Sequence, residues 1–492
     1  MDSTTKTDIN PIHIDDINRK PVPEPIDPKA ERRVIRKCDL HVVPVLMIIC
    51  LLAFLDRINI GNARLQGLER DLGMGGNDYN LALFNFFIPY ILCEIPCNLI
   101  MKKLAPSTWL NSIMALWGLF ATGIITICQG FVQDNGALMA CRFLFGMFEA
   151  GFLPGCVYLI SMYYKRYELQ WRLTLFFTAS ILAGAVSGLL AYGMSYMDGI
   201  QGYSSWRWIF ILEGIATVVV AVTAKFFIVD WPDKARFLSD AERAILQSRL
   251  QSDQGAYRMD RLDKVAGKRI AADVKIYLGT IMYLGVLNTG YAASFFTPTL
   301  LNEMGWTSLE AQIMSVPVYI VAAVLTLCMA LLSDRLQHRF GCAMTGCLIA
   351  TVGYSILLAQ DFVSTGVKYF AIFAVVGGGY IAQPIMIGWL SNNMSGHYKQ
   401  AIASAVQIGF GNCGGFVASN VFIQSESPHY RSGYGTSLGL IWVTGFASII
   451  MFVMLVRENR KRERGERDHM LRLDQHEADN LGDAHPHFRF TY

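Results

Sequence analysis

Charged residues are scarce in this sequence, since Asp, Glu, Lys and Arg together make up only 16% of its 492 residues. A typical soluble domain carries about 25% charged residues. The charges also concentrate near the two ends and in one central stretch, which leaves long apolar runs between them. This pattern excludes a soluble enzyme with a nucleotide fold, a secreted disulfide scaffold and a mainly disordered protein. Basic and acidic residues nearly balance, 42 against 39, so the charge does not favour a nucleic-acid partner.

The sequence also lacks the short motifs that mark common catalytic sites. It contains no Walker A motif of an ATP-driven motor, no G-x-S-x-G elbow, no H-E-x-x-H pair and no cysteine-rich zinc pattern. Its eleven cysteines lie mostly inside the apolar runs, where we expect them to pack as small buried residues. The polar N-terminal stretch has no short apolar core with a cleavage site, so a secretory signal peptide is not expected. We therefore predict that the protein is not an enzyme and holds no metal or cofactor.

Long apolar runs are the dominant feature of the sequence. A helix that crosses a bilayer needs about 20 mostly apolar residues, and twelve such runs occur, six before and six after a polar stretch at 230–272. Their high Gly and Ala content is typical of closely packed membrane helices. The runs span 41–61, 80–101, 109–130, 136–161, 174–197, 208–229, 275–297, 311–332, 342–360, 369–390, 401–423 and 436–456.

These runs predict an all-α polytopic membrane protein with twelve transmembrane helices in two six-helix bundles. Six runs on each side of a central loop are typical of transporters built from two repeat-related halves. The predicted parts are a cytosolic N-terminal tail, an N-terminal bundle, a central cytosolic loop, a C-terminal bundle and a cytosolic C-terminal tail, at 1–40, 41–229, 230–272, 273–456 and 457–492.

The distribution of basic residues predicts the orientation of the chain in the membrane. If the N-terminus is cytosolic, 34 of the 42 Lys and Arg residues fall in cytosolic segments and 5 on the opposite side. Cytosolic loops normally carry the excess of Lys and Arg. We therefore expect both termini in the cytosol.

Ionisable residues inside the runs are the first candidates for function. Each costs about 2.5–3.5 kcal/mol on insertion scales, and such residues mark functional sites by default. Arg142 and Glu149 share one helix face, whereas Asp56 and Arg57 point about 100° apart. We expect Arg142 to pair with Glu149, which leaves Arg57 for the cavity. The whole set, confined to the first six runs, is Asp56, Arg57, Glu94, Arg142, Glu149, Glu213 and Lys225.

Two interpretations of this cluster remain open. It is either a structural set of ion pairs, or an anion-binding Arg57 beside a carboxylate, Glu149 or Asp56, that carries a proton. The second reading has a physical basis, since a guanidinium keeps its proton and its fork matches a carboxylate. We expect Glu94 and Glu213 to have structural roles, Glu94 at a helix kink beside a proline.

The six later runs carry neutral polar side chains instead of charges. Each can bond either a neighbouring helix or a substrate, and bonding between helices is the commoner role. Amides opposite an arginine nevertheless suit a small organic acid, so Gln383 and Asn412 are candidate substrate contacts. The neutral set is Asn288, Tyr291, Gln383, Gln407 and Asn412.

Four segments carry a resemblance to a known family. The run FLDRINIGNAR at 54–64 resembles the first span of the fungal anion:cation symporters, also called the allantoate permease family, within the major facilitator superfamily. The resemblance covers roughly residues 40–456 and leaves out both tails. The supporting runs are RFLFGMFEAGFLPG at 142–155, WIFILEG at 208–214 and NMSGH at 393–397.

This resemblance implies proton-coupled import of a small organic anion, such as nicotinate, pantothenate or allantoate, across the plasma membrane. It implies that Arg57 binds the substrate carboxylate and that Tyr90 and Asn412 touch the substrate. Better-understood relatives have a glutamine where this chain has Glu94, so the local polarity differs.

The same resemblance implies the proton-coupling residues. Asp56 and Glu149 would take part in coupling, with Arg142 as their partner. The expected ligands are the anion and the proton, the expected surroundings are the lipid bilayer, and a monomer is expected. Two other functions stay open, an exporter of an acidic secondary metabolite and a nutrient sensor that binds without transport. The Gly-Pro motif of drug/proton exporters is missing from residues 181–188, which favours import.

Overall fold

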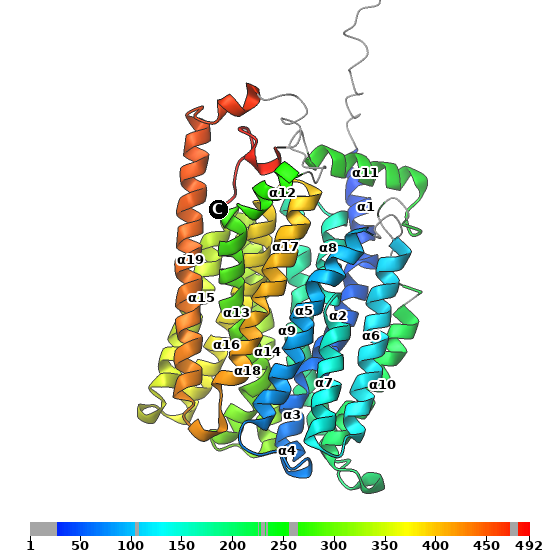
Figure 1. Cartoon of the computed structure of the whole chain (residues 1–492), viewed down its shortest axis with the longest axis vertical. Helices are drawn as coiled ribbons and strands as arrows, with labels where there is room; N and C mark the ends of the chain where they lie inside the picture. The colour runs from blue at the N-terminus through cyan, green and yellow to red at the C-terminus, as the bar shows by residue number, and fades with distance from the viewer. Residues whose placement is uncertain are drawn as a thin grey trace, which may run out of the picture.

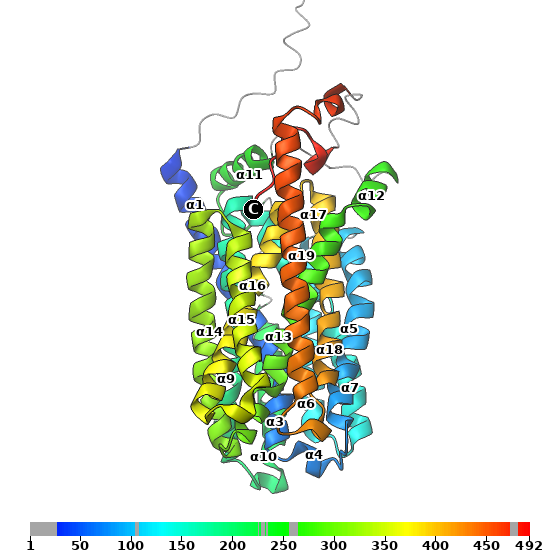
Figure 2. The ribbon, with the colours of Figure 1, turned by 90° about the vertical axis from the view of Figure 1, so that its left-hand side faces the viewer.

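The structure is a computed structural model that describes residues 27–103, 108–224, 226–227, 232, 235–254, 264–472 and 481–492. Within these ranges the regular elements are all helices, and Figures 1 and 2 show most of them side by side along the long axis. The predicted all-α fold is therefore confirmed. The first tail and the central loop lie only in part within these ranges, and Lys225 lies outside them.

Nineteen α-helices make up the described chain. They are α1 (Pro28–His41), α2 (Val43–Ile58), α3 (Ile60–Leu65), α4 (Leu68–Asp71), α5 (Asp78–Lys103), α6 (Thr108–Phe131), α7 (Asn135–Glu149), α8 (Phe152–Tyr163), α9 (Arg166–Ser195), α10 (Ser205–Ala224), α11 (Asp240–Gln254), α12 (Lys264–Ala271), α13 (Val274–Glu303), α14 (Ser308–Leu336), α15 (Arg339–Leu358), α16 (Thr365–Asn392), α17 (His397–Gly411), α18 (Cys413–Val421) and α19 (Arg431–Glu463).

Each of the twelve predicted apolar runs overlaps between one and three consecutive helices. Among the described residues, eight helical segments are long and apolar enough to cross a membrane, and nine if the bent pair α12–α13 counts as one span. The eight are Pro28–Leu65, Asn135–Tyr163, Trp171–Ser195, Ser205–Ala224, Ser308–Leu336, Arg339–Leu358, Thr365–Asn392 and Arg431–Glu463.

Three of the runs are interrupted where polar side chains lie. The first breaks at Asn59, two residues after Arg57, and the fourth breaks directly after Glu149, the last residue of α7. The eleventh breaks at Asn412, which stands between α17 and α18. At Asn59, Ala150 and Asn412 the backbone keeps right-handed helical dihedral angles, so each run continues with only a slight irregularity.

The two halves of the chain, α1–α10 and α13–α19, pack closely at the end of the bundle away from α11 and α12, called here the far end (Figures 1 and 2). An added Cβ at Gly188 of α9 would stand 2.6 Å from the carbonyl oxygen of Gln312 of α14. One at Gly61 of α3 would stand 2.8 Å from the carbonyl oxygen of Phe295 of α13. Glycine thus lets the backbones of the two halves meet at the far end.

Candidate substrate site

A buried ion pair joins α2 to α7. Arg57, in the last turn of α2, donates from Nη2 to Glu149 Oε1 at 2.6 Å and from Nε to Oε2 at 3.3 Å. Both residues are almost inaccessible, with 1% and 3% of their surface exposed. The two-pronged contact is the strong form of an arginine–carboxylate interaction. Because both charges are out of water, removing either partner would leave an uncompensated buried charge.

The expected pairing of Arg142 with Glu149 is wrong. Arg142 instead donates from Nη1 to the backbone carbonyl of Arg57 at 3.3 Å. Its Nε and Nη2 have no hydrogen-bond partner among the described residues. Seven residues of helix separate Arg142 from Glu149 by about 10 Å along the axis. Arg57 approaches Glu149 from the neighbouring helix α2 and takes both carboxylate oxygens.

A chain of hydrogen bonds extends from this ion pair into the second half of the protein. Arg57 Nη1 donates to the Tyr291 hydroxyl of α13 at 2.7 Å, and that hydroxyl donates to Asn412 Oδ1 at 2.7 Å. Asn412 Nδ2 then donates to Glu94 Oε2 of α5 at 3.3 Å. We call these five residues, Glu149, Arg57, Tyr291, Asn412 and Glu94, the Arg57 network. The network crosses the boundary between the two halves twice, at Arg57–Tyr291 and at Asn412–Glu94. A change in the partners of Arg57 would therefore change bonds that hold the halves together.

Four aromatic rings surround the Arg57 guanidinium. Its central carbon lies 4.8, 5.0, 4.9 and 5.7 Å from the ring centroids of Phe54, Phe86, Tyr90 and Tyr291. Rings at such distances attract a cation through their negative faces. They also keep water away, which strengthens the attraction of Arg57 for any anion beside it. Tyr90 thus lies beside Arg57, and its buried hydroxyl has no hydrogen-bond partner in the described part of the chain.

Asp56 lies outside the Arg57 network. It is fully buried, and neither carboxylate oxygen has a hydrogen-bond partner within the described ranges. As the neighbour of Arg57 on one helix, it points about 100° away, toward Thr217 of α10. Glu213, one turn before Thr217, is equally buried. The structure thus separates the two predicted proton carriers, with Glu149 on Arg57 and Asp56 on the α10 side of α2.

The second-half amides divide into two groups. Asn412 joins the Arg57 network, whereas Gln407 and Asn288 bond neighbouring helices. Gln383 is buried on α16, and its Oε1 lies 3.9 Å from the position of an added Cβ at Gly290, the residue before Tyr291. Gln383 therefore borders the network without a bond to it in the described structure.

Sequence reasoning missed two members of the network. It treated Tyr291 as one of several polar side chains and Glu94 as part of a helix kink. A carboxylate four residues after Tyr90 in an apolar run was a signal for Glu94, because i and i+4 share a helix face. No spacing in one sequence relates the seventh run to the first, so the bridge through Tyr291 was not readable.

The fold and the site together define a class of protein. Long apolar helices in two packed halves are typical of secondary transporters. A model of the Major Facilitator Superfamily matches residues 46–419. The chain belongs to this superfamily, and it is therefore a multi-pass membrane transporter rather than an enzyme.

Fungal transporters share much of the sequence. The chain is 35% identical to an uncharacterized transporter of Schizosaccharomyces pombe, over 89% of this chain and 86% of that protein. It is 32% identical to the MFS-type transporter cnsO of Penicillium expansum, over 94% of this chain and 91% of that protein. The chain thus spans nearly the whole length of these relatives.

Solved structures confirm the predicted major facilitator fold. A D-xylose-proton symporter superposes with a TM-score of 0.62 at 13% identity, covering 84% of this chain and 97% of the symporter. A bacterial homolog of the lysosomal transporter Spinster, in an inward-facing and occupied conformation, gives 0.59 at 16% identity, with coverages of 84% and 96%. At these identities the likeness shows the fold alone.

Tyr291→Phe tests the bridge between the halves. The substitution keeps the ring beside Arg57 but removes the hydroxyl that joins Arg57 to Asn412. Hydrogen bonds between membrane helices contribute about 0.6 kcal/mol on average, and an unsatisfied buried group adds to the loss. We expect a destabilisation of about 1 kcal/mol, measured as a lower midpoint of thermal unfolding of the purified protein in detergent.

Tyr192→Phe is the matched control, because the Tyr192 hydroxyl bonds Tyr196 at the protein surface. This variant should unfold at the midpoint of the unchanged protein. Equal midpoints for the Tyr291 and Tyr192 variants would contradict the bridge.

Proposed function

We propose that the protein is a proton-coupled symporter that imports a small organic anion with a carboxylate group. The observation that carries this proposal is the Arg57–Glu149 pair. The Glu149 carboxylate holds the guanidinium in the way that a substrate carboxylate would, so it acts as an internal substitute for the substrate. The resemblance of residues 54–64 and 142–155 to the fungal anion:cation symporters supports this assignment and makes nicotinate, pantothenate and allantoate the first substrates to try.

Arg57 is suited to be the anion site. A guanidinium stays charged at any physiological pH, and its planar fork offers two parallel donors to a carboxylate. The surrounding rings lower the local dielectric, which increases the attraction between opposite charges. A carboxylate substrate that replaces Glu149 would keep the guanidinium paired, as a buried charge requires.

Glu149 links the anion to the proton. An anion can take the Arg57 fork only if Glu149 leaves it, and an ionised Glu149 would then be buried without a partner. Protonation of Glu149 removes that charge, so one proton enters as one carboxylate binds. Proton and anion therefore strengthen each other's binding, and the coupling is reciprocal.

The other predicted site residues would act around the Arg57–Glu149 pair. Tyr90 lies beside the guanidinium, and its hydroxyl has no partner among the described residues. Asn412 bonds the Tyr291 hydroxyl and Gln383 lies near Gly290, so these three side chains would contact the body of the substrate. Arg142 holds the backbone of Arg57, and Asp56 provides a second carboxylate on the same helix. We assign Arg142 and Asp56 to proton coupling.

Transport would follow from rocking of the two halves around the site. With both termini in the cytosol, as the Lys and Arg distribution favours, the far end, where the halves meet at Gly188 and Gly61, would face the outside of the plasma membrane. The opposite state requires the contacts at Gly188 and Gly61 to open.

Arg57→Lys tests the anion site. The variant keeps a positive charge but loses the two-pronged geometry. In a thermal-shift screen of purified protein against nicotinate, pantothenate, allantoate and other small carboxylates, we expect one or more to stabilise the unchanged protein. Arg57→Lys should bind that ligand about tenfold or more weakly.

The matched control is Arg431→Lys, because Arg431 is exposed and pairs with Asp361 at the surface. Its affinity should equal that of the unchanged protein. If Arg57→Ala binds and transports the anion normally, the anion site is elsewhere.

Glu149→Gln tests the coupling, because glutamine resembles the protonated carboxyl. In proteoliposomes the variant should still exchange substrate in counterflow, with binding less dependent on pH, but should lose accumulation driven by a pH gradient. Asp56→Asn serves as the comparison, measured side by side in both assays.

The two variants separate the two candidate carriers. If Asp56→Asn shows the exchange-only behaviour while Glu149→Gln binds poorly, Asp56 carries the proton and Glu149 has a structural role. Continued accumulation of substrate by Glu149→Gln would likewise exclude Glu149 as the carrier.

A further inference from the structure

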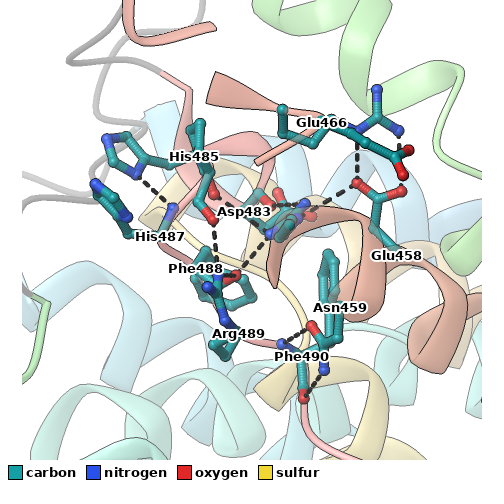
Figure 3. A network of polar contacts seen from close by, with 12 residues as sticks. Glu458, Asn459, Glu466, Asp483, His485, His487, Phe488, Arg489 and Phe490 are labelled. Carbon is teal, nitrogen blue, oxygen red and sulfur yellow. Dashed lines mark hydrogen bonds and ion pairs between the residues drawn. The ribbon is translucent and has the colours of Figure 1, made fainter. Parts of the chain in front are cut away.

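The segment 481–492, called here the tail strap, lies on the end of the second half opposite the far end (Figures 1 and 2). Figure 3 shows Phe490 of this segment beside Asn459 of α19, and Asp483 and Phe488 in the same polar network. The sequence predicts only a cytosolic tail here. The structure instead buries Leu481, Asp483, Phe488 and Phe490.

Asp483 binds two buried lysines from different helices. Its Oδ1 accepts a hydrogen bond from Lys399 Nζ of α17 at 2.7 Å, and its Oδ2 accepts one from Lys275 Nζ of α13. Asp273, which caps α13, lies 2.5 Å from Lys399 Nζ and 3.4 Å from Lys275 Nζ. Two carboxylates thus balance two ammonium groups, and Asp483 is only 2% exposed. It ties the start of α13 to the start of α17.

Phe490 fastens the strap to α19. Asn459 donates from Nδ2 to the Phe490 carbonyl at 2.9 Å and accepts from the Phe490 amide at 3.0 Å. The ring of Phe490 lies 4.3 Å from Lys275 Nζ and 4.4 Å from the guanidinium carbon of Arg462. Arg462 also donates to the carbonyls of Phe488 and Asp483 at 2.8 and 2.9 Å. The same segment therefore holds α19 against α13.

Thr491 fastens the strap to the end of α16. Its amide donates to Asn393 Oδ1 at 2.8 Å, and its carbonyl accepts from Asn393 Nδ2 at 3.0 Å and from Trp389 Nε1 at 3.1 Å. The carbonyl of Tyr492 accepts from the Arg339 amide at the start of α15 at 2.5 Å. All of these partners lie between residues 273 and 462, so the strap binds helices of one half.

We propose that the tail strap fixes the ends of α13, α16 and α17 relative to one another and thereby positions Tyr291, Gln383 and Asn412, which these helices bring to the site. The strap holds one half as a rigid unit and leaves the two halves free to rock. Its effect on substrate binding rests on the proposed function, whereas its effect on the helices does not. Asp483 is a positioning residue in this account, because it acts through the helices it joins.

The charge balance explains why Asp483 matters. Without it, Lys275 and Lys399 would share Asp273 alone, and one buried ammonium would lack a counter-charge. Burial alone would raise the pKa of the Asp483 carboxyl, but the two lysines outweigh burial and hold its pKa below the ordinary value. The Asp483 carboxyl is therefore ionised at neutral pH, so its ion pairs with Lys275 and Lys399 hold the strap in place at that pH.

Hydrogen exchange of the full-length protein tests the fastening. We expect Asp483→Asn to speed amide exchange at the starts of α13 and α17 about tenfold or more, because local protection follows local stability. Asp483→Glu should restore protection. Phe490→Ala removes the ring over Lys275 and provides a second variant with the same expected result if Asp483→Asn does not fold. The control is Arg489→Gln, since Arg489 is exposed and bonds the carbonyls of Pro486 and Phe488.

A double-mutant comparison tests the positioning. If the strap positions Tyr291 against Asn412, Tyr291→Phe should lower the unfolding midpoint about half as much in the Asp483→Asn protein, or in Phe490→Ala, as in the unchanged protein. Where a carboxylate is transported, Asp483→Asn should raise its KM with little change in kcat. Asp483→Glu should reverse that rise.

Two results would overturn the proposal. One is unchanged exchange at α13 and α17 in both Asp483→Asn and Phe490→Ala. The other is full additivity of the Tyr291 and strap substitutions. Neither assay needs a substrate, so a failure of all carboxylates to bind would count against the proposed function and leave these results standing.

Discussion

The buried ion pair between Arg57 and Glu149 is the interaction on which the interior of this protein depends. A guanidinium cannot be neutralised under physiological conditions, and in a low-dielectric interior it requires a negative partner. The pair is 2.6 Å long at its shorter contact and is enclosed by four rings, so water does not supply that partner. Any event that removes Glu149 must therefore bring another anion to Arg57.

The second half of the chain contacts Arg57 through a hydrogen bond. The Tyr291 hydroxyl accepts a hydrogen bond from Arg57 across the boundary and donates one to Asn412, which lies between α17 and α18. The ends of the helices that carry these residues converge at the tail strap, about Asp483. In our account, the substrate carboxylate replaces Glu149 at Arg57 in the first half. The second half supplies a rigid set of polar side chains that contact this site.

The free-energy cost of a charge inside a membrane and the length of the apolar runs were enough to predict the fold class and two residues of the site. The price of a charge inside a membrane picked out Arg57 and Glu149 in the sequence, and the length of apolar runs located helices that the structure contains. The pairing was less predictable. Arg142 shares a helix face with Glu149, but Glu149 pairs with Arg57 instead. Which arginine pairs with Glu149 depends on how α2 packs against α7. Tyr291 and Asp483 escaped prediction for the same reason, since their partners lie 234 and 208 residues away.

The central claim is that a carboxylate substrate displaces Glu149 from Arg57 and that Glu149 takes up a proton as it leaves. The most direct measurement is proton uptake on binding, followed with a pH-sensitive dye in weakly buffered solution of the purified protein. The account predicts uptake of about one proton for each carboxylate bound at neutral pH, and none in Glu149→Gln despite retained binding. Binding without proton uptake in the unchanged protein, or unchanged uptake in Glu149→Gln, would contradict it.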